Sequence, residues 1–319
     1  MPVKPKDIPN FVRLHSCLGL DQIAIGTRPV WWAFESPLPL VLSTLCETAS
    51  GNFWDVGANT GLYSVLAARH LGGDRVHAFE PVPTIAGLCR DNLKLNSVAV
   101  TVHEVALSDR IGAATIYLPD AGHGLIETSA SLSPDFKSSA QPSFSVPTTT
   151  IDQLRPDFGA MSVLKVDVEG FEAQVLRGAE ETIRSDQPII AVELMNGFDA
   201  DYFHAFLARH NYDLIALPSN RPAFVTSELR FRLDGWNQLL VPHQHTDSVL
   251  EQVRDLYAAE VSAPGVGEAQ EVMRQLNLEI AAGGAELEQA LDTIRQLQHG
   301  ARSWHQRARS RLRRHLNRV

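Results

Sequence analysis

The chain has 319 residues, of which 44% are hydrophobic and 20% charged, a composition typical of a globular protein. Its net charge of −9 argues against a general nucleic-acid-binding protein, because such proteins usually carry a basic face. The three cysteines are widely spaced, no apolar run approaches the roughly 20 residues that cross a bilayer, and no apolar segment follows the basic N-terminus. We therefore expect a cytoplasmic protein without disulfides or a secretory signal.

The N-terminal part (1–50) is predicted to be a small cap that ends in a helix over the apolar stretch Leu38 to Leu45. From Gly51 to about Leu194, short apolar runs alternate with helical patterns, which indicates βαβ units on a parallel sheet. The predicted strands are Phe53–Val56, Val76–Phe79, Thr101–Val105, Val163–Val168 and Ile189–Leu194. The predicted helices are Tyr63–His70, Pro83–Leu95 and Gly170–Ser185, the last bent near Gly178. Two further strands, Ala113–Leu118 and Ser145–Thr150, flank a loop (119–142) with the composition of a lid or a disordered segment.

The chain after residue 200 predicts a helix (Asp201–His210), two strands that form a terminal hairpin on the sheet (Tyr212–Leu217 and Trp236–Val241) and another helix (Thr246–Glu260). We divide the chain into the cap (1–50), an α/β domain (51–245) and a C-terminal helical region (246–319). From Arg302 onward there are seven arginines and no acidic residue. This tail predicts either a basic amphipathic helix that contacts an anionic membrane surface or an acidic partner, or a solvated terminus.

The main chemical signal is the glycine-containing turn between the first strand and helix of the α/β domain, Asp55-Val-Gly57-Ala-Asn59-Thr-Gly61. Ligands bind doubly wound sheets at such turns, at the carboxyl ends of the strands. A dinucleotide fingerprint needs glycines at positions 57, 59 and 62, where this chain has Gly57, Asn59 and Leu62. Asp55 would repel a pyrophosphate but attract the cationic amino-acid end of S-adenosylmethionine, so we predict the latter as the cofactor.

Acidic and small residues at the ends of the next two strands extend this predicted site. Glu80 follows the second strand about 20 residues after the turn, where an acidic side chain can accept both ribose hydroxyls. Ala106 lies in the exit of the third strand, which we expect to flank the adenine ring, although an ordinary strand exit explains this segment equally well. A purely structural turn at Gly57 to Gly61 remains the simpler alternative.

These blocks, taken in order, resemble the FkbM family of methyltransferases. The resemblance rests on Asp55 to Ser64, on Phe-Glu80-Pro81, on Val105-Ala-Leu-Ser-Asp and on Lys165-Val-Asp167-Val-Glu169-Gly-Phe-Glu172. It spans about residues 51 to 194, more weakly to about 242, and leaves 260–319 without a counterpart.

The resemblance implies a Rossmann-like methyltransferase domain. The pattern of predicted elements adds that this α/β domain is doubly wound, with a mostly parallel sheet, an antiparallel terminal strand or hairpin and a C-terminal helical appendage. It implies S-adenosylmethionine-dependent O-methylation of a hydroxyl group on a sugar, glycan or polyketide-type acceptor. The predicted cofactor contacts are Asp55, Gly57, Asn59, Gly61, Tyr63, Glu80, Pro81, Ala106 and Asp167.

A hydroxyl acceptor must lose its proton during attack, which requires a nearby carboxylate or imidazole. Asp167, at the end of a strand on the cofactor edge, is the first candidate for this base or for the group that holds the acceptor. The further candidates are Glu169, which could instead stabilise a helix start, Glu193, which could be structural, and His123 in the predicted lid. The pair His243 and His245 lacks a third ligand, so we expect no metal.

Two other functions remain open on the sequence alone. An inactive methyltransferase fold could serve as a scaffold for the C-terminal helices, although a scaffold has no need of Asp55, Glu80 and Asp167. An NAD-dependent oxidoreductase is disfavoured by Asn59 and Leu62. The sequence does not identify the acceptor or the oligomeric state.

Overall fold

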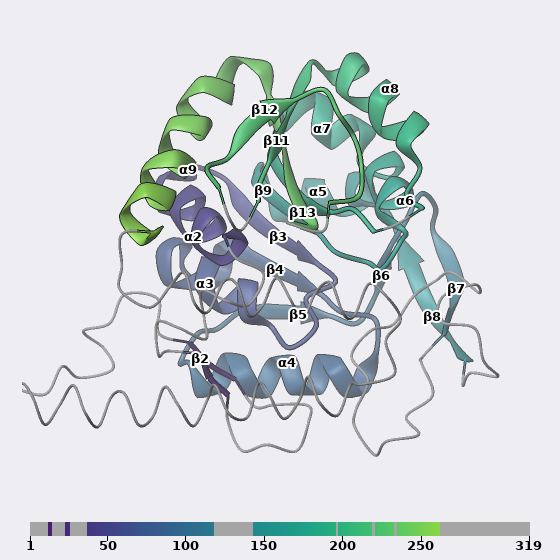
Figure 1. The fold of residues 1–319 in the computed structure, drawn as a ribbon. Coiled ribbons are helices and arrows are strands. Elements are labelled where there is room, and N and C mark those ends of the chain that lie inside the picture. The colour runs from purple at the N-terminus through teal and green to yellow at the C-terminus, as the bar shows by residue number, and fades with distance from the viewer. Residues whose placement is uncertain are drawn as a thin grey trace, which may run out of the picture.

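The computed structural model describes residues 12–14, 23–25, 37–117, 143–195, 197–218, 221–232 and 235–261. A central sheet lies between helices in this part of the chain (Figure 1). Its strand order is β12–β11–β13–β10–β9–β3–β4–β5. The strands are β3 (Asn52–Val56), β4 (Val76–Phe79), β5 (Thr101–His103), β9 (Met161–Val166), β10 (Ile189–Glu193), β11 (Tyr212–Ala216), β12 (Phe224–Thr226) and β13 (Asn237–Pro242).

The five neighbouring strands β10, β9, β3, β4 and β5 run parallel, whereas β13 runs antiparallel to both β10 and β11. The chain builds outward from β3 in one direction (β4, then β5) and from β9 in the other (β10). The order of the strands therefore reverses between β3 and β9, which makes their carboxyl ends the expected ligand-binding edge. The predicted doubly wound sheet with an antiparallel terminal pair is confirmed, and β12 is an additional edge strand that the sequence did not predict.

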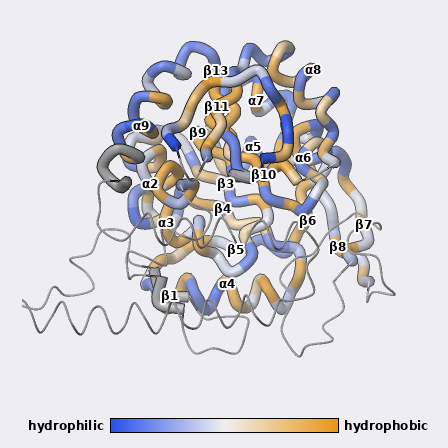
Figure 2. Tube along the Cα trace, in the orientation of Figure 1, coloured by the Kyte–Doolittle hydropathy of each residue, from blue (hydrophilic) through white to orange (hydrophobic). Residues whose placement is uncertain are grey.

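Side chains alternate along the strands and so build one apolar core on each face of the sheet. Phe53 packs with α2 (Leu38–Thr48), α3 (Leu62–Leu71), α4 (Pro83–Leu95) and α9 (Thr246–Val261). Trp54 packs on the other face with α5 (Ile151–Phe158), α6 (Glu172–Arg177), α7 (Glu180–Asp186) and α8 (Ala200–His210). The helices carry hydrophilic and hydrophobic stretches in turn, as expected for elements with one buried face (Figure 2).

A second sheet of three strands lies beside the main one (Figure 1). It consists of β6 (Ala106–Leu107), β8 (Ser143–Thr149) and β7 (Gly112–Tyr117), with β8 in the middle. Ile116 and Val146 pack with Ile85 of α4 in a small separate core. Short elements complete the fold: β1 (Val12–Leu14), β2 (Ile23–Ile25) and the 3-10 helices η2 (Gly73–Arg75) and η3 (His243–His245).

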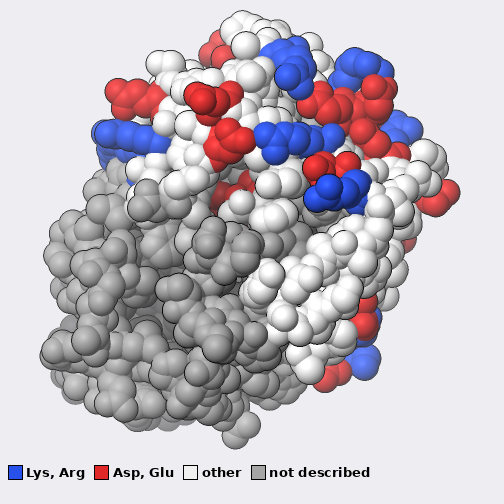
Figure 3. Space-filling model, turned by 90° about the vertical axis from the view of Figure 1, so that its right-hand side faces the viewer, with Lys and Arg blue, Asp and Glu red and all other residues white. Residues whose placement is uncertain are grey.

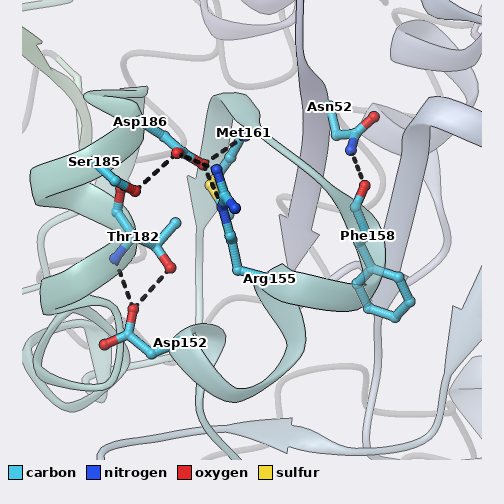
Figure 4. Close-up of polar contacts among 8 residues, drawn as sticks. All are labelled: Asn52, Asp152, Arg155, Phe158, Met161, Thr182, Ser185 and Asp186. Atoms are coloured by element: carbon cyan, nitrogen blue, oxygen red, sulfur yellow. Dashed lines mark hydrogen bonds and ion pairs between the residues drawn. The ribbon is translucent and has the colours of Figure 1, made fainter.

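The sequence did not predict helix α5, which polar contacts attach to α7 and β9 (Figure 4). The carboxylate of Asp186 accepts hydrogen bonds from Arg155 at 2.8 Å and from the amide of Met161 at 2.9 Å. Asp152 accepts from both the amide and the hydroxyl of Thr182, at 2.8 and 2.7 Å. These contacts explain how a helix with Pro156 inside it keeps its place.

Helices α2 and α9, which lie outside the predicted α/β domain, both join the core of the main sheet. Helix α2, which the sequence placed in the cap, packs on α3, and Ser43 on α2 hydrogen-bonds His70 on α3 at 2.8 Å. Val249 and Val253 of α9 are 4% and 2% exposed in the same core. The division at residues 50 and 245 remains a prediction, but α2 and α9 share the core of the domain between them.

Among the helices that the structure describes, none is both long and apolar enough to cross a membrane. Figure 3 views the side of α6, α8 and the small sheet, where acidic and basic side chains are interspersed over the described surface. Ion pairs on α6 and α8 agree with this mixture, including Arg177 with Asp199 at 2.9 Å and Arg209 with Glu180 at 2.8 Å.

Candidate active site

The glycine turn lies between β3 and α3, as predicted. Gly57, Asn59 and Gly61 all have positive φ, at 77°, 49° and 85°, which glycine tolerates and asparagine adopts more readily than most residues. The amides of Gly57 and Ala58 both donate to the carbonyl of Phe79 at 3.0 Å, so the turn is tied to the end of β4. This arrangement brings the turn next to Glu80.

Asp55 lies fully buried in β3, two residues before the turn. Its Oδ2 accepts a hydrogen bond from the hydroxyl of Ser64 on α3 at 2.7 Å, while Oδ1 is buried without a hydrogen-bond partner. Burial raises the pKa of Asp55, and the nearby Lys165 and Ser64 offset this only in part. Oδ1 lies 3.9 Å from the ammonium group of Lys165 and accepts no hydrogen bond, so this buried carboxylate is a suitable site for a further cationic group.

Glu80 is 5% exposed at the end of β4. Its two oxygens accept hydrogen bonds from the backbone, one from Asn59 and one from Val82, each at 3.0 Å. Burial raises the pKa of Glu80 to about 7, although these bonds oppose the shift. Each carboxylate oxygen has two lone pairs, so both can still accept a ribose hydroxyl. Glu80 thus holds the glycine turn and keeps capacity for a ligand.

Beside the turn, Asp167 follows directly after the neighbouring strand β9, and its amide donates to the carbonyl of Val56 at 3.0 Å. Its carboxylate lies 2.9 Å from the ammonium group of Lys165. A side-chain hydrogen bond also joins it to Glu193. Burial raises the pKa of Asp167, but Lys165 and these hydrogen bonds outweigh burial and hold the pKa below its usual value.

Glu193 ends β10 beside Asp167, because Val192 and Val166 are paired in the parallel register. This position lets the Glu193 side chain make the hydrogen bond that helps to lower the pKa of Asp167. Asn237 of β13 pairs with Glu193 in turn, so Asp167, Glu193 and Asn237 form a polar row across three strands.

Glu169 lies in a loop rather than at a helix start, which corrects the predicted helix Gly170–Ser185. Glu169 and Gly170 have φ values of 53° and 98°, and α6 begins at Glu172. The Glu172 carboxylate accepts from the amides of Gly170 and Val168 at 3.0 and 3.3 Å. Glu172 therefore stabilises the loop after Asp167. The structural role that the sequence suggested for Glu169 is thus filled by Glu172.

The other predicted residues have different positions. Tyr63 lies beneath Lys165, with the ammonium group 4.7 Å from the ring centroid. Pro81 directly follows Glu80, and Ala106 packs with Val82, whose amide binds Glu80. His123 lies outside the described residues, as does the arginine-rich tail. Within the described ranges, no three His, Cys, Asp or Glu side chains converge as metal ligands.

Lys165 belongs to this site, but its role was not predicted from the sequence. It is 2% exposed and lies between Asp55 and Asp167. The available signal was a charged residue inside an otherwise apolar strand, Val163 to Val166, since lysine is almost never fully buried unless it is paired.

Comparisons with known proteins give similar sequences. The family model described as "Methyltransferase FkbM domain" matches residues 55–214. A 31-O-demethyl-FK506 methyltransferase FkbM from Streptomyces tacrolimicus is 27% identical over 207 residues, which cover 55% of this chain and 77% of that protein.

Solved structures are similar at lower identity. A methyltransferase FkbM from Methylobacillus flagellatus KT is 17% identical with a TM-score of 0.37, and the match covers 75% of this chain but half of that one. A precorrin-6y C5,15-methyltransferase from Geobacter metallireducens GS-15 is 14% identical with a TM-score of 0.36, over 64% of this chain and 85% of that one.

Proposed function

Because this chain belongs to the FkbM methyltransferase family, we propose that it transfers a methyl group from S-adenosylmethionine to a hydroxyl group of a small-molecule acceptor, such as a sugar, glycan or polyketide. The observation that carries this proposal is that two sets of acidic residues lie at the ends of neighbouring strands, one set on each side of the boundary between β3 and β9. Asp55 and Glu80 surround the glycine turn after β3, and Asp167 with Glu193 follows β9 and β10.

The residues around the turn fit S-adenosylmethionine, which supplies an electrophilic methyl group on a positively charged sulfur. Asp55 offers a buried carboxylate oxygen for the positive charge of the ligand. Glu80 offers acceptors for ribose hydroxyls, and the turn lacks the glycine at position 59 that a pyrophosphate cradle requires. Gly57, Asn59, Gly61, Tyr63, Pro81 and Ala106 complete the proposed cofactor contacts.

Asp167 is the proposed group that binds the acceptor hydroxyl and accepts its proton. It is ionised, because Lys165 and Glu193 favour its charged form, and its side chain keeps 21% exposure in a buried surrounding. Glu193 fixes its orientation through their shared hydrogen bond. Positioning the acceptor in this way can supply much of the rate, since methyl transfer needs an in-line approach.

The Streptomyces tacrolimicus relative, a 31-O-demethyl-FK506 methyltransferase, supports oxygen as the accepting atom. The alternative function, an inactive methyltransferase fold that acts as a scaffold, needs neither a buried acid at Asp55 nor an ionised Asp167.

Three measurements test the proposal. Isothermal titration should show binding of S-adenosylhomocysteine and none of NAD. Incubation with isotopically labelled S-adenosylmethionine and a panel of hydroxyl compounds should label an acceptor. Asp167→Asn should lower turnover by about 10²–10⁴-fold while S-adenosylhomocysteine affinity changes far less.

The matched control is Asp91→Asn on α4, an exposed carboxylate that lies outside this site and should leave turnover unchanged. Binding of NAD in place of S-adenosylhomocysteine would refute the cofactor. Binding of S-adenosylhomocysteine without labelling of any compound in the panel would favour the scaffold.

A further inference from the structure

Lys165 is a buried cation at the centre of the candidate site. It lies within β9 between Leu164 and Val166, both fully buried, and its own side chain is 3% exposed. Removing an ammonium group from water is costly unless opposite charges compensate for the lost hydration. The surroundings of Lys165 must therefore supply those charges.

Two carboxylates supply them, one from each side of the point where the strand order reverses. The Lys165 ammonium lies 2.9 Å from Oδ2 of Asp167, on its own strand, and 3.9 Å from Oδ1 of Asp55, on β3. Asp55 and Lys165 are paired in the register of these strands, so both side chains face α3. Tyr63 of α3 covers the ammonium from that side.

Tyr63 from α3 contacts the Lys165 ammonium, and Glu193 from β10 hydrogen-bonds Asp167. Glu80 from β4 and Glu172 from α6 are further acidic groups close enough to interact with the charge of Asp167. Burial raises the pKa values of Asp55, Glu80 and Glu172, and the charge of Asp167 adds to each rise. Lys165 opposes this repulsion at Asp55 and at Asp167.

We propose that Lys165 is a positioning residue that keeps Asp167 ionised and oriented while it separates the charge of Asp167 from that of Asp55. It thereby joins the cofactor half of the site to the acceptor half. The role given to Asp167 in this inference rests on the proposed function, but the charge relationship itself does not.

The electrostatic role predicts what loss of the charge does. Lys165→Met keeps an unbranched side chain of similar length and removes the positive charge. Asp167 would then lie beside Asp55 and Glu193 without its cation, so its pKa should rise. An opposite charge within 4–6 Å typically moves a pKa by roughly one to three units, and we expect a rise within that range.

The direct test is a ¹³C NMR titration of the aspartate carboxyl carbons in the ligand-free protein, with the Asp167 resonance assigned through Asp167→Asn. Lys165→Met should raise the titration midpoint of Asp167 by about one pH unit or more. Lys94→Met, the same change at an exposed lysine of α4, should leave that midpoint where it is. A folded Lys165→Met protein with an unchanged midpoint would overturn the inference.

Two further variants separate charge from packing and serve if Lys165→Met does not fold. Lys165→Gln should raise the Asp167 midpoint, whereas Lys165→Arg should keep it low, and equal midpoints in these two variants would reject the electrostatic role.

In the active enzyme, loss of the charge should move the acid limb of the pH–rate profile to higher pH, so activity should be recoverable when the pH is raised. A purely structural residue would lower the rate at all pH values.

The two proposals can fail separately. Absence of methyl transfer by the wild-type chain would refute the proposed function. The NMR titration would still test whether Lys165 lowers the pKa of Asp167. An unchanged Asp167 midpoint would reject the role of Lys165 while methyl transfer by the wild-type chain stood.

Discussion

Gly57 lies directly against the backbone of Asp167: a Cβ atom on Gly57 would fall 1.8 Å from the carbonyl oxygen of Asp167. The amide of Asp167 in turn donates to the carbonyl of Val56, the residue before Gly57. The turn proposed to hold the cofactor and the residue proposed as base therefore pack backbone to backbone. Neither can shift without the other.

Gly57→Ala should therefore disrupt both halves of the site. The substitution adds a methyl group where there is no space and forces a left-handed conformation that costs about 1–2 kcal/mol for a residue with a Cβ. We expect a loss of at least about 2 kcal/mol in the free energy of unfolding, measured by urea denaturation, and weaker S-adenosylhomocysteine binding. Gly87→Ala is the control, because a Cβ there meets nothing within 4 Å and alanine favours a helix. Wild-type stability in Gly57→Ala would contradict the packing.

Glu80 should make cofactor binding depend on pH. Its pKa is raised to about 7, and ribose hydroxyls donate to the ionised form. The affinity for S-adenosylhomocysteine should thus be full above pH 7 and fall as the pH drops through about 7 toward 5. Glu80→Gln should bind more weakly by about 1–3 kcal/mol at pH 8 and lose most of the pH dependence. Titration calorimetry from pH 5 to 8 measures both effects.

The matched variant for this experiment is Glu104→Gln, near the end of the adjacent strand β5, where the carboxylate is 39% exposed and pairs with Arg90. It should behave as the wild type. A pH dependence that persists in Glu80→Gln would assign the ionisation to another group.

His77 should make the fold sensitive to acid. It is 8% exposed and stacks on Phe158, with ring centroids 4.1 Å apart, and both ring nitrogens are buried without hydrogen-bond partners. Burial, and secondarily His103, lowers its pKa to about 4. The unfolded chain binds this proton near pH 6.5, so stability is complete above that value and falls as the pH drops toward 4.

His77→Phe keeps a planar ring and removes this titration. The variant should lose less stability than the wild type between pH 7 and pH 5, with a difference of up to about 1.4 kcal/mol for each pKa unit of the shift. Urea denaturation at the two pH values gives the comparison, with the exposed His204→Phe as the control. Equal acid losses in His77→Phe and wild type would show that the buried imidazole does not determine this dependence.

The core contacts of helix α9 determine how much of the C-terminal region can be removed before the chain is destabilised. Val249 and Val253 are buried in the core, and Arg254 donates to the carbonyl of Ala223 at 3.1 Å. A chain that ends at Val266 should fold and bind S-adenosylhomocysteine as the full chain does. A chain that ends at His245 loses these contacts and should be destabilised by several kcal/mol, as expected for exposing two core side chains. Circular dichroism and calorimetry distinguish the two, and loss of binding by the longer fragment would place part of the site beyond Val266.

The sequence was most informative where local signals were strong. The predicted bounds of β4 and α4 agree with the structure, because apolar alternation and a proline at the helix start mark them directly. The turn from Gly57 to Gly61 was found for the same reason. Helix α5 was missed because it is short, polar and contains Pro156, and tertiary contacts of Asp152 and Arg155 hold it.

The contacts of the site depend on strand register, which no local pattern in this sequence specifies. Lys165 and Asp55 are 110 positions apart, yet they are paired neighbours across β9 and β3. The pairing of Glu193 with Asn237 likewise requires the antiparallel direction of β13. Motifs therefore predicted the acids of the candidate site, but only the three-dimensional arrangement shows that Asp55 and Asp167 lie beside the same cation.

The antiparallel direction of β13 also bears on how such enzymes diversify. The strand begins at Asn237, beside the end of β10, so the chain between β11 and β13 returns to the edge of the sheet where Asp167 and Glu193 lie. The family match ends at residue 214, before this connection. If the acceptor binds at Asp167 as proposed, insertions or substitutions in this connection would alter its surroundings and leave the proposed cofactor residues on β3 and β4 unchanged. Selection could then exchange one acceptor for another without rebuilding the proposed methyl-donor half of the site.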